Sequence, residues 1–223
     1  MTPFIRPSTA CALLLCSFVA CLATLPSPSA EAATLVGRVE LKAGARQQVE
    51  AREVADTLVY FVPDAKTAPP PAGRFTIDTH SKGFVPSVLV VPQGSEVAFP
   101  NRDSILHHVF SRTPGAEFDL GFYPGGQSRS QVFRKPGLNL VSCNVHHGMR
   151  AMVVVMSTPY YTRPDANGRF RLEGLPDGPG TLVYWHPRGR ASSEKLTLPT
   201  PQPRWQRLTA TKPPIAHDAK AAP

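Results

Sequence analysis

The segment Cys143-Asn144-Val145-His146-His147-Gly148-Met149 contains a thiol, two imidazoles and a thioether within seven residues. The spacing Cys-x2-His-x2-Met offers a sulfur and an imidazole nitrogen as strong ligands and the thioether as a weak one. One further histidine completes the ligand set of a mononuclear copper site of the blue type, which tolerates both Cu(I) and Cu(II). The pattern predicts Cys143, His146 and Met149 as metal ligands.

The further histidine is expected from the segment Asn101–Phe110, which contains His107 and His108. Predicted strands at 138–142 and 151–156 flank the cysteine loop, and a predicted strand at 96–99 precedes the histidine pair. The second histidine must therefore come from a neighbouring strand at the same end of a sandwich. Successive side chains on a strand point to opposite faces, so only one of two adjacent histidines can face the site.

Several plainer interpretations stay open at this point. A buried free cysteine is often only a small hydrophobic residue, and Met149 could fill the core. Zinc also accepts a Cys-His-His set with a fourth donor. His108 and His147 remain alternative ligands or surface sites for a second metal.

The rest of the sequence predicts an all-β chain. Helical periodicity is absent, and short runs rich in β-branched and aromatic residues recur between Pro, Gly, Asn and Asp turn signals. The central series between residues 74 and 156 has seven or so such strands, at a spacing typical of a sandwich. The strands are expected at 35–41, 57–62, 74–78, 87–91, 96–99, 108–111, 131–133, 138–142, 151–156, 169–172 and 181–185.

Residues 74–156 resemble the cupredoxin family, particularly amicyanin, plastocyanin and the related periplasmic proteins of methylamine utilisation. The Asn-Arg run at 101–102, the histidine pair and the short loop from Cys143 to Met149 carry this resemblance. It implies a Greek-key β-sandwich holding one type 1 copper, with His107, Cys143, His146 and Met149 as ligands. It also implies that electrons leave through the edge of His146, with Phe99, Leu106, Val145 and Val153 as plausible walls of the site.

Three departures from the family pattern stand out. Asn144-Val145 occupies the place of the proline between the cysteine and the loop histidine, and Leu106 replaces the proline that often precedes the first histidine. His108 replaces an asparagine that joins the two ligand loops by hydrogen bonds. An imidazole can donate and accept hydrogen bonds, so it could do the same; otherwise the loops would be looser.

A second resemblance concerns the segment Asp165–Pro176 and the strand after it, which look like a transthyretin-like or carboxypeptidase-regulatory β-sandwich. Residues 34–64 and 157–198 are expected to form this small sandwich, with the cupredoxin domain inserted in it or joined to it. The alternative is that these two ends decorate a single larger sandwich. Residues 199–223 are rich in Pro, Ala and Lys and predict a disordered tail.

The N-terminal residues 1–32 predict an export signal. They combine Arg6 with an apolar run that is too short to span a bilayer, and small residues follow. Three of the four cysteines lie there, and Cys21 sits in a loose lipoprotein box, so a lipid anchor is an alternative. No later run reaches membrane length. A periplasmic location is expected.

The formal net charge of +8 fits either a solvated basic surface or docking to acidic protein partners. No basic block is interleaved with aromatic residues, which argues against nucleic-acid binding. No nucleophile–base constellation and no second copper cluster appear, so an enzyme is not expected. The sequence thus predicts a single-electron carrier between redox partners. The alternatives are copper delivery or storage, and a non-catalytic module that binds a protein or glycan and holds a structural metal.

Overall fold

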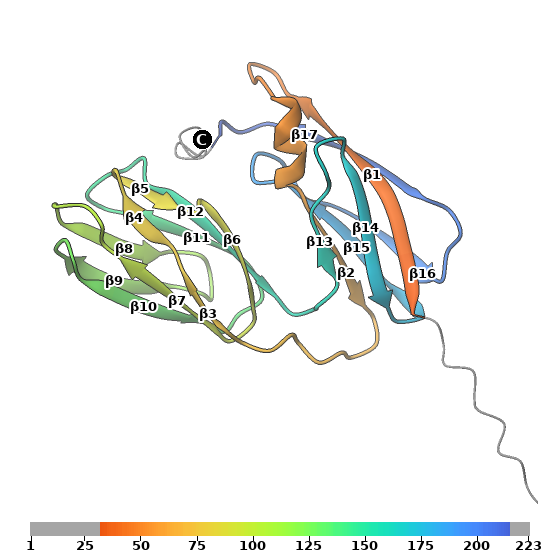
Figure 1. Ribbon diagram of the computed structural model, residues 1–223, viewed down its shortest axis with the longest axis horizontal. Helices are drawn as coiled ribbons and strands as arrows, with labels where there is room; N and C mark the ends of the chain where they lie inside the picture. Colours follow the sequence, from red (N-terminus) through yellow and green to blue (C-terminus); the bar gives the residue numbers. More distant parts are fainter. Residues whose placement is uncertain (1–31, 215–223) are drawn as a thin grey trace, which may run out of the picture. The chain divides into compact units, whose positions relative to one another are not determined.

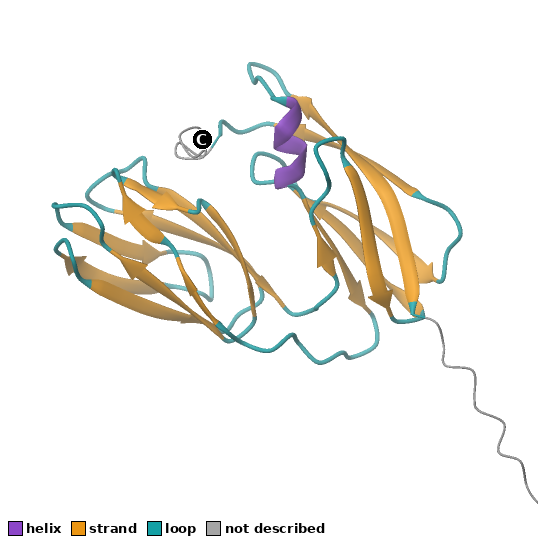
Figure 2. Ribbon diagram, viewed as in Figure 1, coloured by secondary structure: helices purple, strands orange, loops and turns teal. Residues whose placement is uncertain are grey.

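The computed structural model describes residues 32–214 and confirms the all-β class (Figures 1 and 2). The predicted export signal falls outside these residues except for Ala32, as does the end of the predicted tail from 215. One 3-10 helix, η1 (Ala51–Asp56), is present among the described residues. The strands are β1 (Ala33–Ala43), β2 (Leu58–Pro63), β3 (Arg74–Thr76), β4 (Asp78–His80), β5 (Gly83–Val85), β6 (Val88–Pro92), β7 (Ser95–Pro100), β8 (His107–Ser111), β9 (Phe118–Tyr123), β10 (Ser128–Phe133), β11 (Gly137–Cys143), β12 (Arg150–Met156), β13 (Tyr161–Thr162), β14 (Arg169–Leu175), β15 (Gly178–Trp185), β16 (Ser192–Leu198) and β17 (Arg204–Ala210).

The strands from β3 to β12 form a five-stranded sheet in the order β6-β12-β11-β8-β9, a three-stranded sheet β10-β7-β3 and the β4–β5 hairpin. Alternation along β7 turns Val97 and Phe99 inward, where both are fully buried. They belong to one apolar cluster with Val109 and Val141 of the larger sheet, and this cluster also contains Cys143 and Met149. The predicted ligand loop is therefore anchored directly on the core.

The remaining strands come from both ends of the described chain. They form a sheet in the order β14-β1-β17 and a second in the order β13-β2-β15-β16, around a separate apolar cluster that includes Leu35, Phe61 and Phe170. This arrangement is consistent with an interrupted second sandwich. The division into two independent domains, at 74–156 and at 34–64 with 157–198, stays a prediction.

The structure differs from the sequence prediction at β17, which lies inside the segment expected to be a disordered tail. Strand β17 pairs in parallel with β1, from Gly37 opposite Arg204 to Ala43 opposite Ala210. Leu208 and Ala210 point inward and are buried, while Trp205 and Arg207 point outward. Only two apolar residues face the core, and three prolines lie just before the strand, so its alternation is weak in the sequence.

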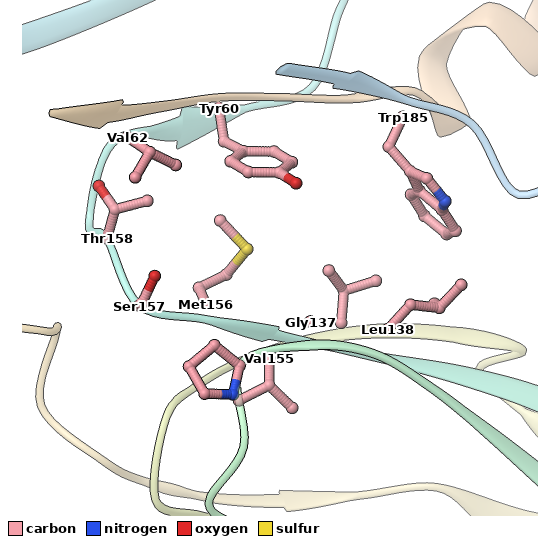
Figure 3. Close-up of a pocket in the computed structure, with 11 residues that line it drawn as sticks. Tyr60, Val62, Gly137, Leu138, Val155, Met156, Ser157, Thr158 and Trp185 are labelled. Carbon is pink, nitrogen blue, oxygen red and sulfur yellow. The ribbon is translucent and has the colours of Figure 1, made fainter. Parts of the chain in front are cut away.

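A third apolar cluster contains Leu58, Val154 and Met156, with Tyr60 and Trp185 packed against it. Beside it lies a groove of about 270 Å³, shown in Figure 3, whose lining is mostly aliphatic and aromatic. Thr158 there donates from Oγ1 to the carbonyl of Phe61 at 2.9 Å. Tyr60 is the titratable residue of the lining, and burial raises its pKa. The lining of this groove thus contains no acid–base pair.

Within the described residues, none of the helical structure is both long and apolar enough to traverse a lipid bilayer.

Candidate metal centre

Three of the predicted ligands converge in the structure. Ligand atoms of His107, Cys143 and His146 all lie within 4.8 Å of one another. The Cys143 sulfur is 3.7 Å from Nδ1 of His107, and the two imidazole rings have centroids 5.3 Å apart at an interplanar angle of 54°. Cys143 is 2% exposed and His107 is completely buried. A thiolate and two imidazoles at this separation can surround a single soft or borderline metal ion.

Strand pairing brings these residues together from distant parts of the chain. His107 is the first residue of β8 and Cys143 is the last of β11; the two strands are antiparallel, with Cys143 opposite Val109. After Cys143 the chain turns, and the N–H of Met149 donates to the carbonyl of His146 at 2.9 Å. This turn holds His146 over the end of the sheet before β12 begins.

Asp103 fixes the orientation of the His107 ring. Its carboxylate oxygen lies 2.9 Å from Nε2 of His107, so Nε2 donates the proton and Nδ1, which faces Cys143, keeps its lone pair. Buried Asn101 shapes the loop that presents Asp103, because its Oδ1 accepts from the Asp103 N–H at 3.0 Å. A carboxylate behind a ligating imidazole fixes the tautomer and raises the basicity of the ligand.

The pKa of Asp103 reflects the same geometry. Burial raises it, but hydrogen bonds from the N–H of Lys82, from His107 and from the N–H of Ser81 together bring it below the usual value. Asp103 therefore stays ionised as a partner for His107. Sequence reasoning missed this residue. Its position four residues before a candidate ligand, in the Asn-Arg-Asp run, was the available signal.

His146 supplies the test of whether a metal fits. Its Nδ1 atom is buried and has no hydrogen-bond partner among the described residues. A buried polar atom without a partner is costly, and native proteins rarely leave one unsatisfied. Here the unpartnered nitrogen belongs to a residue whose ring lies in one cluster with the Cys143 sulfur and the His107 ring. The donor set and this lone nitrogen both fit a bound copper ion.

Met149 and His147 are the other candidate ligands of the loop that follows Cys143. Met149 is fully buried at the end of the same turn and belongs to the apolar cluster that contains Cys143, so its role as a fourth ligand stays a prediction. His147, the next residue after His146, is exposed and lies beside a groove that Arg150 also lines. His147 is not part of the three-residue cluster.

His108 points away from the cluster and joins three segments. Its Nδ1 lies 2.6 Å from Nδ2 of Asn144, and its Nε2 lies 2.5 Å from Oδ1 of Asp119 in β9. Since the carboxylate can only accept, Nε2 donates to it and Nδ1 accepts from the Asn144 amide. The ring also stacks on Phe122 at 4.5 Å between centroids and packs against Phe110 at 5.4 Å.

This geometry answers the question raised by the departure at position 108. An imidazole joins the two ligand loops by a hydrogen bond, through the residue that directly follows Cys143. The pKa of Asp119 is lowered by the hydrogen bond from His108 and then by that from the N–H of Gly121. Asn144 and Asp119 are further site residues that the sequence did not indicate, because nothing in the spacing relates 108 to 119 or to 144.

The expected wall residues divide into two groups. Phe99 and Val153 are fully buried in the core, whereas Leu106 is 51% exposed and Val145 is 41% exposed. Ile105 is also exposed, at 36%. The ligand end of the sandwich therefore presents apolar side chains to solvent from both ligand loops.

Comparison with known proteins finds similar structures at a low level. No protein-family model and no curated protein matches the chain. A purple cupredoxin from Nitrosopumilus maritimus is 22% identical, with a TM-score of 0.33, over 36% of this chain and 98% of that one. The M51A mutant of amicyanin in its Cu(I) form is 22% identical, with a TM-score of 0.36, over 44% of this chain and 99% of that one.

A copper-containing nitrite reductase from Thermus scotoductus is 24% identical, with a TM-score of 0.36. The match covers 44% of this chain but only 25% of the reductase. Similarity at this level indicates no function for the present chain. The inference must therefore come from the site itself.

Proposed function

We propose that this protein binds one copper ion of type 1 through His107, Cys143, His146 and Met149 and carries single electrons between protein partners in the periplasm. The observation that supports this most is the convergence of ligand atoms of His107, Cys143 and His146 within 4.8 Å of one another, together with the buried, unpartnered Nδ1 of His146. Bound copper would supply the one-electron change between Cu(I) and Cu(II).

The protein's own residues would keep the site nearly unchanged during that step. Asp103 holds the His107 tautomer, and the hydrogen bonds of His108 hold the cysteine loop against β8 and β9. Cys143 and Met149 are buried in the core cluster, which keeps water from the thiolate. Ligands that do not move between oxidation states favour rapid electron transfer.

A carrier needs an exposed contact near the metal rather than a substrate pocket. Leu106 and Val145 provide apolar surface close to His146, and the basic net charge of +8 suits acidic partners. A non-enzymatic role follows from this proposal.

The test is to load the purified protein with Cu(II) and record visible absorption, electron paramagnetic resonance and reversible reduction. An intense blue or purple band from the Cu(II)–thiolate bond is expected in the wild type and should be lost in Cys143→Ala. His146→Ala should lose it as well, while His147→Ala, a matched control next in the chain, should keep it. An unchanged band in Cys143→Ala would reject the site.

The same experiment separates the alternatives. A colourless site that releases Cu(I) readily to a chelator would indicate delivery or storage. A site that holds zinc in preference to copper and shows no redox change would indicate a structural metal. Loss of the band in His108→Ala with retention in His107→Ala would mean that the ligand is the other histidine of the pair.

A further inference from the structure

The sheet β14-β1-β17 exposes one face that is unusually basic. Alternation buries Leu35, Val39, Phe170, Leu172 and Leu208 on its inner side. Its outer side carries five cations, Arg38, Lys42, Arg169, Arg171 and Arg207, and two carboxylates, Glu40 and Glu173. We refer to these seven residues with Trp205 as the arginine face.

The carboxylates are already engaged within this face. Glu40 accepts from Nε of Arg207 at 2.9 Å and lies 3.6 Å from Nζ of Lys42. Glu173 accepts from Nε of Arg171 at 2.5 Å. Arg38 and Arg169 have no ion-pair partner between residues 32 and 214, although Nε of Arg38 donates to the carbonyl of Asn167 at 3.1 Å. The guanidinium of Arg169 and the terminal N–H groups of Arg38 are left for an external anion.

Strand register places these two free arginines directly opposite each other. Arg38 of β1 is opposite Arg169 of antiparallel β14, and on its other side it is opposite Trp205 of parallel β17. Like charges directly opposite on neighbouring strands destabilise a sheet. A pairing that breaks a local rule without compensation inside the fold points to a function.

Trp205 is the second anomaly of this face. It is 57% exposed, and the guanidinium of Arg207 lies 4.8 Å from its ring centroid. The exposed indole offers a flat apolar surface and an N–H donor, a combination that suits Trp to interfaces. The row Arg169–Arg38–Trp205 crosses three strands and spans about 10 Å.

The chemistry of the face selects among partners. The forked guanidinium donors bind carboxylates or phosphates in pairs, and the exposed indole offers a flat apolar surface beside them. A protein interface needs an apolar centre poor in charge, whereas the exposed large apolar residues here are Val36 and Trp205. An anionic membrane would gain only about 1 kcal/mol per basic residue, which is weak for a net of three charges.

We propose that the arginine face binds an anionic polysaccharide, with acidic groups held by Arg38 and Arg169 and a sugar ring stacked on Trp205. This would assign a docking role to the second set of sheets. Binding at the arginine face needs no bound copper, so its test does not depend on the electron-carrier proposal.

The experiment measures binding of a hexamer of galacturonic acid by isothermal titration, with its methyl-esterified form as the uncharged probe. The double variant Arg38→Gln/Arg169→Gln should weaken binding at least tenfold, and Trp205→Ala at least fivefold. The matched control Arg190→Gln/Lys195→Gln removes two exposed charges elsewhere, one in the β15–β16 loop and one on β16, and should change binding less than twofold. Rising salt should weaken the wild type.

Fluorescence gives a second measurement that locates the ligand. The chain has two tryptophans, so in a Trp185→Phe background the emission comes from Trp205 alone. Binding of the charged hexamer should shield this residue from iodide quenching. Equal binding of the esterified hexamer, an equal loss in the control variant, or no shielding of Trp205 would overturn the proposal. Tighter binding of polyglutamate or oligo-dT would overturn it in favour of a protein or a nucleic acid.

Discussion

Replacing His108 by phenylalanine isolates the hydrogen bonds that join the two ligand loops. The new ring is similar in shape and keeps the stacking between Phe110 and Phe122, so little packing is lost. What disappears is the bond from Asn144 at 2.6 Å and the bond to Asp119 at 2.5 Å.

The size of the effect follows from the exposure of the two partners. The Asp119 side chain is 62% exposed, so its pairing contributes about 0.5 kcal/mol, as surface pairs do. The partly buried bond to Asn144 contributes about 1 kcal/mol. Together they favour the joined arrangement of the loops by about 1.5 kcal/mol, which corresponds to about a tenfold change in an equilibrium constant. Copper must order the loops itself in the variant, so its affinity should fall by about that factor.

A competition titration against a chromogenic copper chelator measures this affinity. His147→Phe is the matched control, because it makes the same replacement at an exposed residue of the ligand loop. The control should stay within about twofold of the wild type, since it removes no bond. An affinity of His108→Phe that equals the wild type, together with an unchanged urea midpoint for the copper-free protein, would refute the role of His108 in joining the loops.

Three further predictions concern other residues of the molecule. Asp103→Ala should lower copper affinity by about 10- to 100-fold in the same titration, the usual effect of removing the partner of a ligating imidazole. Asp78→Ala is the control, and equal copper affinities of the two variants would contradict this prediction. Met149→Leu should keep the thiolate absorption band and raise the reduction potential in voltammetry, since the weak axial ligand tunes the potential; a lowered potential would count against Met149 as a ligand. Glu53→Ala should cost about 3 kcal/mol in urea unfolding, because it leaves the Arg188 side chain, only 4% exposed, without its carboxylate. Burial raises the pKa of Glu53, but hydrogen bonds from the N–H of Glu50 and from Arg188 lower it further than burial raises it. The ionised Glu53 therefore contributes its full share to the free energy of unfolding above pH 4.5, the pKa of the unfolded chain, and this share is lost as the pH falls through the lower pKa of the folded protein. Glu53→Ala lacks this share at every pH, so acidification through this range should destabilise the variant less than the wild type.

Local patterns in the sequence predicted most of the strands and indicated that residues of two distant segments would meet at one end of the sandwich. The run Ser142-Cys143 at the end of an alternating segment places the thiol at a strand end, and the histidine pair follows another strand in the same way. The spacing within the loop predicted Cys143 and His146, whereas the choice of His107 over His108 rested on the resemblance to the cupredoxin family.

Contacts that depend on the tertiary fold could not be anticipated. The bond from His108 to Asp119 depends on the register of β8 with β9, which shifts between His108 and Phe110. Strand β17 could not be predicted from the sequence for two reasons. Its partner β1 is more than 150 residues away along the chain, and its own buried face consists only of Leu208 and Ala210. Pairing between strands that are far apart in the chain cannot be predicted from the local alternation of either strand.

The pairing of β1 with β14 and β17 bears on how the chain is made. A ribosome releases Ala33–Ala43 early, but the neighbours of this strand appear only with residues 169–175 and 204–210. The strands from β3 to β12 lie between these segments in the sequence and pair among themselves, so they do not need the partners of β1. Strand β1 therefore has two unpaired edges until residues 169–175 and 204–210 reach it, and the cations Arg38 and Lys42 on its outer side oppose aggregation in the meantime.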